Sequence, residues 1–445
     1  MKTSRLAFAL VPLFVVASLP AQTSWTAGTG NFTDSSNWSA GVPSNNNTFI
    51  TNGTSGAPSI VNLSNGSNQY VANLTLTADN TLNVNANSLL WISGNISNNG
   101  AINLGTGYFI VNSPNLTLTG SGTVTLSAPN SYFEGTSTGQ TLTNQSTIVG
   151  QGTVGNGYLA VVNSGTINAN VSGQTLTLDG VSGSVNTANT GLIEATNGGV
   201  LAISGGAVNN AGGNLTASGT GSTLLVTGNT TVKGGNLTAS GTGSTLEISG
   251  AVVQGGTLTN SGGTMGTQPG YTATLDGSTA AGAVTLNGTY ANGANTSTYV
   301  NGSIVNHGTI ALTAGNSGLS SYLQLQGSTT LSGGGTLTLG SSDGSGTAYI
   351  QQSGGSATLT NADNTIQGYG TIGNGTLTLV NQGTINANSS GKTLLLNGGG
   401  GVTNTGTLEA TERRWQKHSG QWRRRADPRL HDRGRSPDGN GWRHL

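Results

Sequence analysis

Cysteine is absent from this chain of 445 residues, which excludes disulfides and thiolate metal sites. Charged residues make up only 6% of the chain and aromatic residues only 5%. Because bulky apolar residues are scarce, the chain cannot fill the thick core that a conventional globular domain of this length needs to offset chain entropy. The chain is instead rich in Gly, with 75 residues, and in Ser, Thr and Asn. Two classes remain: a disordered polar chain, or a repetitive β architecture with a thin shared core. The short β-branched runs favour the second.

Long apolar runs are absent beyond the N-terminus. Lys2 and Arg5 precede the apolar stretch 6–19, and the letters LPAQ provide a cleavage site after Ala21. Since this stretch is too short for a stable membrane span, residues 1–21 are predicted to be a signal peptide that engages the export machinery. We therefore expect an exported protein, extracellular or at the cell surface, with no membrane span in the mature chain.

Internal repeats organise the body of the chain. The letters GGNLTASGTGSTL occur at 212–224 and again at 234–246, an offset of 22 residues. A longer pair of similar segments, 150–178 and 368–396, is separated by 218 residues. A shorter unit, Asn-x-[Gly/Ser]-[Thr/Ala/Leu]-[Ile/Leu], begins at seven positions: Asn98, Asn144, Asn163, Asn189, Asn306, Asn381 and Asn404.

Between these units, runs such as LTLTADNTLNVNA and YLQLQG alternate apolar and polar residues, which is typical of strands with one face buried. Gly, Asn and Ser between the runs are suited to turns. This pattern predicts an all-β fold, a parallel β-helix with rungs of about 22 residues that stack about 4.8 Å apart. Residues 56–411 would then give on the order of 16 rungs and a rod about 75–80 Å long. The repeated asparagines are predicted to occupy left-handed turn positions and to form a ladder of side-chain hydrogen bonds.

A solenoid needs covered ends, because an open end rung can pair with other chains. Residues 22–55 are rich in aromatic residues and glycine turns, and they are predicted to form the N-terminal cap. Within them, the segment SWTAGTGNFTDSSNWSAGVP contains a motif defined by Trp25, Gly28, Gly30, Phe32, Asp34, Asn37, Trp38, Gly41 and Pro43.

This motif, followed by a Gly-, Asn- and Thr-rich repeat region, resembles the N-terminal part of bacterial autotransporter-like exported proteins. The resemblance covers the signal, the motif and the repeats, and so most of the chain. It implies a right-handed parallel β-helix of the passenger or adhesin type, displayed at the cell surface or released from it.

Acidic residues are the main candidates for chemistry, since some parallel β-helices are polysaccharide lyases or hydrolases that depend on clustered carboxylates. Here the ten acids of 22–411 are scattered singly along the sequence. Pairing across rungs is conceivable, for instance between Asp179 and Glu194. Glu194 and Glu409 fill the same slot of the duplicated block, which favours an architectural role. We predict no catalytic residue, no cofactor and no metal site.

His307 is the one histidine of the body, and it occupies the variable position of the Asn-x-Gly-Thr-Ile unit. The variable position of a turn is usually exposed, so we expect a solvated side chain. With no second histidine nearby and no cysteine, a transition-metal site is not expected.

The last segment, 412–445, differs in chemistry from the rest. It carries ten bases and four acids, a net charge of +6, whereas 22–411 carries two bases and ten acids, a net charge of −8. One interpretation is a basic arm for nucleic acid or anionic polymers. The other is a frameshift. When Thr196 is aligned with Thr411, the first copy continues Asn-Gly-Gly and the second Glu-Arg-Arg-Trp.

The codons GAA CGG CGG TGG would encode this Glu-Arg-Arg-Trp, and one base later they encode Asn-Gly-Gly, which restores the repeat. We favour the frameshift, and so we expect a disordered tail and no nucleic-acid partner. Together these observations predict an exported structural or adhesion module that contacts glycans, extracellular matrix or like rods. It would be outer-membrane associated if the restored frame encodes an anchor. The alternative is a carbohydrate-active or carbohydrate-binding β-helix, similar to pectate lyases.

Overall fold

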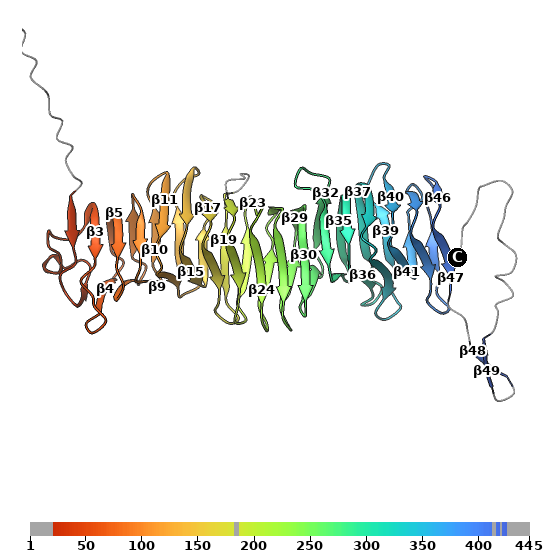
Figure 1. Ribbon diagram of the computed structural model, residues 1–445, viewed down its shortest axis with the longest axis horizontal. Coiled ribbons are helices and arrows are strands. Elements are labelled where there is room, and N and C mark those ends of the chain that lie inside the picture. Colours follow the sequence, from red (N-terminus) through yellow and green to blue (C-terminus); the bar gives the residue numbers. More distant parts are fainter. Residues whose placement is uncertain (1–20, 182–186, 412–414, 419–420, 425–445) are drawn as a thin grey trace, which may run out of the picture.

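The computed structural model describes residues 21–181, 187–411, 415–418 and 421–424, of which 21–181 and 187–411 form a long rod (Figure 1). Strands β1 to β47 belong to one 47-stranded sheet that winds around the rod, and the paired strands within it are parallel. The winding makes about 17 turns of about 23 residues each. The predicted parallel β-helix is therefore confirmed, and at about 4.8 Å per turn the rod is about 80 Å long.

Each turn contributes strands to three faces, which we name by the strands that pair along them. The first face contains β3 (Ser44–Ile50), β5 (Asn68–Leu76), β7 (Leu89–Ile92), β10 (Tyr108–Val111), β13 (Tyr132–Gly135), β16 (Gly152–Gly155), β19 (Thr175–Asp179), β22 (Val200–Ser204), β25 (Thr223–Val226), β28 (Thr245–Ile248), β31 (Thr264–Thr267), β34 (Thr289–Asn292), β36 (Thr309–Ala314), β38 (Thr336–Ser341), β41 (Thr365–Gly368), β44 (Thr384–Ala387) and β47 (Thr407–Ala410).

The second face begins with β1 (Gln22–Ser24) and the later parts of β3 and β5, which pass round a corner. It continues with β8 (Ile96–Asn98), β11 (Asn115–Thr119), β14 (Gln140–Asn144), β17 (Leu159–Asn163), β20 (Thr187–Asn189), β23 (Ala207–Asn209), β26 (Thr231–Lys233), β29 (Ala251–Gln254), β32 (Thr272–Gly277), β35 (Thr296–Asn306), β37 (Ser321–Ser332), β39 (Ala348–Gln352), β42 (Gly370–Ile372) and β45 (Leu394–Leu396).

The third face shares β35 and β37, two long strands that also pass round a corner. Its other members are β2 (Thr29–Asn31), β4 (Ser59–Leu63), β6 (Asn80–Val84), β9 (Ala101–Leu104), β12 (Thr123–Leu126), β15 (Thr147–Gly150), β18 (Thr166–Ala169), β21 (Leu192–Ala195), β24 (Asn214–Ser218), β27 (Asn236–Ser240), β30 (Gly256–Ser261), β33 (Val284–Asn287), β40 (Thr358–Asn361), β43 (Thr378–Asn381) and β46 (Val402–Asn404).

The period-two alternation of the sequence decides which side chains enter the rod. In β24 and β27, which have the same five residues, the leucine and alanine are buried and the asparagine, threonine and serine point outward. Because the strands pair in register, Leu215 stacks on Leu237, and Leu237 on Leu258. Stacks of this kind join into one apolar core that runs from Trp25 to Leu396.

Equivalent strands in the two copies of the long duplicated block lie on different faces. The identical letters TINA form β18 on the third face in the first copy and β44 on the first face in the second copy. Turns differ in length, so that equivalent asparagines in successive turns are 19, 26 and 21 residues apart. The offset between the copies therefore does not correspond to a whole number of turns.

The solenoid sheet ends at β47, one residue before Thr411. Beyond it, β48 (Trp415–His418) and β49 (Gln421–Arg424) pair only with each other, as an antiparallel sheet of their own. The rest of the tail that was expected to be disordered lies outside the described residues. Within the described part of the chain, no helix is long and apolar enough to cross a bilayer.

Two neighbouring residues of β21 test the inward and outward assignment. Ile193 is fully buried between Ile167 and Leu215, whereas Leu192 points outward between Thr166 and Asn214. We expect Ile193→Ala to lower the free energy of unfolding by about 2–5 kcal/mol, because it leaves a cavity in the core. Leu192→Ala should change it by no more than about 0.5 kcal/mol. Chemical denaturation followed by circular dichroism measures both, and equal losses would contradict the assignment.

Candidate functional site

The residues of the N-terminal motif come together in the first turn of the solenoid, between β1 and β3. Trp25, Phe32 and Trp38 are buried, and the Trp38 ring meets both others edge-on, with ring centroids 5.0 Å from Trp25 and 4.9 Å from Phe32. The Trp38 indole N–H donates to the carbonyl of Phe32 at 2.6 Å, and the Trp25 indole N–H donates to the carbonyl of Gly28 at 3.3 Å. These three side chains form the first part of the core.

Polar residues of the same motif fix the turn that carries Trp38. Asp34 caps the short 3-10 helix η1 (Ser35–Asn37), since its carboxylate accepts from the backbone N–H and the hydroxyl of Ser36, at 3.0 and 2.7 Å. These hydrogen bonds hold the pKa of Asp34 below its ordinary value. Asn37 donates to the carbonyl of Asn31 at 3.0 Å. Gly30 lies against Asn37, the Gly41 carbonyl accepts from the hydroxyl of Thr23, and Pro43 is buried.

The repeated asparagines form a buried ladder at the corner between the second and third faces. The amide of Asn144 donates to the side-chain oxygen of Asn163 at 2.7 Å, Asn163 to Asn189 at 2.9 Å, and Asn189 to Asn210 at 2.8 Å. Asn210 was not among the predicted members, because the letters that follow it depart from the repeat. In the same corner nearer the N-terminus, Asn98 donates to the carbonyl of Thr123 instead.

A second ladder occupies the corner between the third and first faces. Asn361 donates to Asn381 at 2.8 Å and Asn381 to Asn404 at 2.7 Å. Asn306 joins it through Asn364, whose side-chain oxygen accepts its amide at 3.0 Å. The predicted ladder of side-chain hydrogen bonds is therefore present, in two parts that lie on different corners.

The prediction of left-handed turn positions for these asparagines is wrong. None of the seven predicted asparagines has a positive φ, although others do, such as Asn87 and Asn156. Each predicted asparagine is the last residue of its strand, with its side chain turned back over the corner. The Asn189 oxygen, for example, accepts from the backbone N–H of Gly191 at 3.2 Å. This local hydrogen bond makes the turn without a left-handed residue.

The acidic residues do not converge on one site. Asp179 lies on the first face, beside Ser204, and Glu194 lies on the third face, between Asn168 and Thr216, so the pairing considered for them does not occur. The amide of Asn168 donates to the Glu194 carboxylate at 2.9 Å, and Glu409 is paired with Asn386 in the register of the sheet. Among the residues that the structure describes, no group of three or more His, Cys, Asp or Glu side chains is placed to hold a metal ion.

His307 is exposed, as predicted, and its Nδ1 lies 3.0 Å from the carbonyl oxygen of Gly333.

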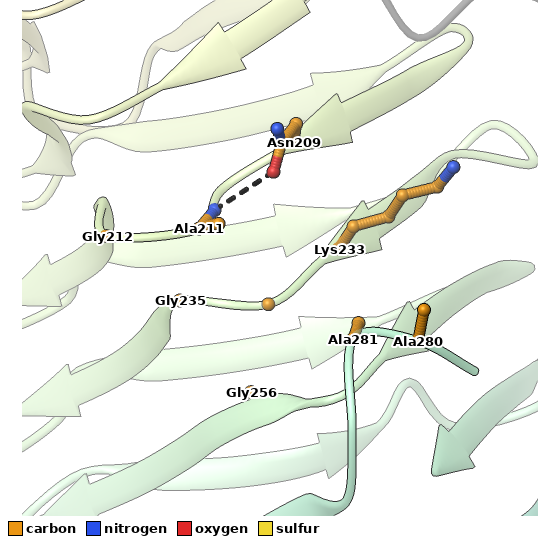
Figure 2. Close-up of a pocket in the computed structure, with 9 residues that line it drawn as sticks. Asn209, Ala211, Gly212, Lys233, Gly235, Gly256, Ala280 and Ala281 are labelled. Carbon is orange, nitrogen blue, oxygen red and sulfur yellow. Dashed lines mark hydrogen bonds between the residues drawn. The ribbon is translucent and has the colours of Figure 1, made fainter. Parts of the chain in front are cut away.

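A hollow of about 680 Å³ opens at the corner between the second and third faces, just beyond the end of the first ladder (Figure 2). Its walls are mostly main chain, because Gly and Ala fill the corner: it is lined by Asn209, Ala211, Gly212, Lys233, Gly234, Gly235, Gly256, Ala280 and Ala281. A Cβ on Gly235 would lie 2.0 Å from the carbonyl oxygen of Asn210, so this position has no room for a side chain. Lys233 is the one charged residue in the lining.

Aromatic side chains gather on the first face near the N-terminal end of the rod. Four successive strands, β5, β7, β10 and β13, place six large side chains in two outward columns, which we call the aromatic patch: Tyr70, Leu89, Trp91, Tyr108, Ile110 and Tyr132. Tyr70 stacks on Trp91 with ring centroids 5.7 Å apart, and Tyr108 stacks on Tyr132 at 5.1 Å. The planes of the two pairs are inclined by 19° and 5°.

The patch borders on polar groups. Asn68 is exposed beside Leu89, and Glu134 follows Ile110 in its column. The amide of Asn156 donates to the Glu134 carboxylate at 3.2 Å. Burial, with smaller effects from Tyr132 and Glu134, raises the pKa of Tyr108. The patch thus combines apolar ring surface with hydroxyl, amide and carboxylate groups at its edge.

Sequence reasoning missed this patch. The four aromatic residues follow one another at intervals close to one turn, which is a signal that the sequence does contain. Which of the three faces each residue occupies depends, however, on the lengths of the individual turns. Comparison with protein-family models, with curated proteins and with solved structures gave no match.

The first asparagine ladder can be tested at its centre. Asn189 is fully buried and bonded to Asn163 and Asn210. We expect Asn189→Ala to lower the free energy of unfolding by about 1–3 kcal/mol, because it leaves buried polar groups of its neighbours without partners. Asn404→Ala, at the exposed end of the second ladder, should cost less than about 1 kcal/mol. Denaturant titration compares the two, and a loss for Asn189→Ala as small as the one expected for Asn404→Ala would contradict a stabilising role of the buried ladder.

Burial raises the pKa of Glu247 above its ordinary value of 4.5. A carboxyl whose pKa is raised by folding stabilises the fold while it is protonated and loses this contribution as the pH rises through the folded pKa. We therefore expect Glu247→Gln to raise the melting temperature relative to the parent protein at pH 7, and the difference to vanish below about pH 4. Thermal melts at both values test this. A variant that is less stable at pH 7 would contradict it.

Proposed function

We propose that the mature chain is an exported β-solenoid, displayed at the cell surface or secreted, that serves as a structural and adhesion module of the autotransporter-passenger type. The observation that carries the proposal is the regular polar surface of the rod. On the third face, Thr216, Thr238 and Thr259 form one outward row. Beside it, Asn236 donates to the side chain of Asn214 at 3.0 Å, so that the amides are ordered along the same direction.

Such rows offer the same hydrogen-bonding group at each turn of a stiff scaffold. A partner that is itself repetitive, such as a glycan, a matrix fibre or a like rod, can engage many of these groups at once. Weak contacts then add up to a high avidity, because every contact after the first is made at a high effective concentration. This mode of binding needs no single deep pocket.

The aromatic patch favours carbohydrate binding as a second candidate. Aromatic rings with adjoining hydroxyl and amide groups suit sugars, which carry both apolar C–H surface and hydroxyls. Carbohydrate cleavage of the pectate-lyase type would need several carboxylates in one place. The described acids lie singly on separate strands and turns, and we therefore place the binding role above a catalytic one.

Export and adhesion are tested together. Expressed from a Gram-negative host with its own N-terminus, the chain should appear outside the cytoplasm, cleaved after Ala21, and a version without residues 1–21 should stay inside. The purified rod should coat glycan or matrix surfaces and resist washing. Mass spectrometry of the mature N-terminus and a surface-binding assay give the readouts.

Retention of the full chain in the cytoplasm would contradict export, and failure to coat any glycan, matrix or like-rod surface would contradict adhesion. Release of reducing sugars or unsaturated uronates from a polysaccharide, with or without Ca²⁺, would assign the chain to the carbohydrate-active alternative.

A further inference from the structure

The rings of the aromatic patch overlap only in part. Atoms of stacked rings touch at about 3.5–4.0 Å, whereas the ring centroids of Tyr108 and Tyr132 are 5.1 Å apart and those of Tyr70 and Trp91 5.7 Å apart. Nearly parallel rings at these separations must be displaced sideways, as in the offset arrangement that aromatic pairs prefer. Part of each ring face therefore stays uncovered by its neighbour.

The patch is exposed to solvent at one end, and one of its side chains is buried below its surface. Tyr70 is 44% exposed, whereas Ile110 is only 2% exposed although its position in β10 is an outward one. Ile110, whose neighbours in its column are Trp91 and Glu134, is therefore covered by the side chains around it. The neighbour of Tyr70 on the preceding turn is Ser44, and that of Tyr132 on the following turn is Thr153. Small residues thus leave both ends of the patch open along the rod.

The size of the patch argues against a protein partner. Four turns at about 4.8 Å and two columns about 7 Å apart give an area on the order of 100 Å². A stable protein interface buries about 800 Å² on each partner. A patch of this size matches a few sugar units, and one unit of an extended β-linked chain is about as long as the spacing between turns.

The charge around the patch distinguishes acidic from neutral glycans. The body of the chain carries a net charge of −8, and Glu134 lies at the edge of the patch. Glu134 would repel an acidic glycan at close range, and neither Lys233 nor Lys392 is on the strands of the patch. A neutral glycan carries no charge to repel, and its hydroxyls can bond Asn68, Glu134 and the tyrosine hydroxyls.

The geometry points to the aromatic patch as a binding site for a neutral glycan, whose pyranose rings lie along the rod against the exposed ring surface of the two offset pairs, Tyr70–Trp91 and Tyr108–Tyr132. This inference rests on the proposed adhesive function and names its ligand class. It places recognition at one end of the rod, while the polar rows elsewhere supply weaker, less selective contacts.

The test uses the purified full chain in affinity electrophoresis and titration calorimetry. The probes are three soluble neutral polysaccharides, mixed-linkage β-glucan, galactomannan and dextran, with polygalacturonate as the acidic one. The variants Trp91→Ala and Tyr132→Ala remove ring faces from the two columns. Tyr158→Ala and Tyr271→Ala are matched controls, because these tyrosines are 49% and 54% exposed and stand outside the stacked pairs.

The parent chain should bind at least one neutral probe and ignore polygalacturonate. Each patch variant should bind about tenfold more weakly, the ratio that corresponds to 1.4 kcal/mol of lost contact, while the controls bind like the parent. Circular dichroism and the melting temperature confirm that each variant is folded. If Trp91→Ala does not fold, Tyr132→Ala and Tyr70→Ala carry the test.

Equal binding by patch variants and controls, or preference for the acidic probe, would overturn the inference. So would a dimer of the parent chain that dissociates in Trp91→Ala, because the patch would then contact a second copy. If the parent chain still coats surfaces while the patch variants lose nothing, the adhesive function stands and the assigned site fails. If the parent coats no surface at all, the proposed function itself fails.

Discussion

The in-register pairing of parallel strands is the constraint on which the rest of this molecule depends. Backbone hydrogen bonds between successive turns fix their separation at about 4.8 Å and place each residue directly above its counterpart. Each side chain therefore packs against the side chain at the same position one turn away. Leucine stacks on leucine in the core, as Leu215 does on Leu237, and the outward threonines of the same strands line up with equal regularity. The low apolar content of the chain is sufficient because each turn needs only a thin slice of core.

The same constraint decides how polar groups can be buried. A single asparagine inside an apolar core would leave hydrogen-bonding groups without partners. Stacked asparagines satisfy one another, since each amide donates to the side-chain oxygen of the next, as Asn163 does to Asn189. Each also bonds the backbone of its own corner, so the ladder both fills the corner and makes the turn. Where the ladder ends, at Asn210, glycines take over the corner and the surface becomes hollow.

Much of this could be predicted from the sequence, because periodicity and stacking are properties of the letters themselves. The parallel β-helix and the asparagine ladder followed from alternation and from a repeat near 22 residues. The conformation of the asparagines could not be predicted, since Asn suits both left-handed turns and side-chain turns, and the choice between them depends on the strand that precedes it.

The face on which each strand lies could not be predicted either. Asp179 and Glu194 are close in sequence but lie on different faces, and the two TINA segments are one face apart. The face on which a residue lies depends on the lengths of all the turns before it, and these lengths are unequal. An error in the predicted length of one turn therefore assigns every later residue to the wrong face. The aromatic patch was missed for this reason.

A solenoid also constrains where selective binding can arise. Its outer surface repeats along the rod, and repetition gives rows of similar groups and not the convergence of different groups that a catalytic or highly selective site requires. Selectivity must then come from places where the repetition is broken. Two places of this kind in the described rod are the glycine-lined hollow with Lys233 and the aromatic patch. The hollow offers one positively charged side chain, that of Lys233, beside a wall of main chain. The patch joins ring faces, hydroxyls and a carboxylate over four successive turns, and its spacing is that of the scaffold itself. A ligand that extends along the rod can therefore use every turn of the patch in the same way. On physical grounds this makes the patch the stronger centre of recognition.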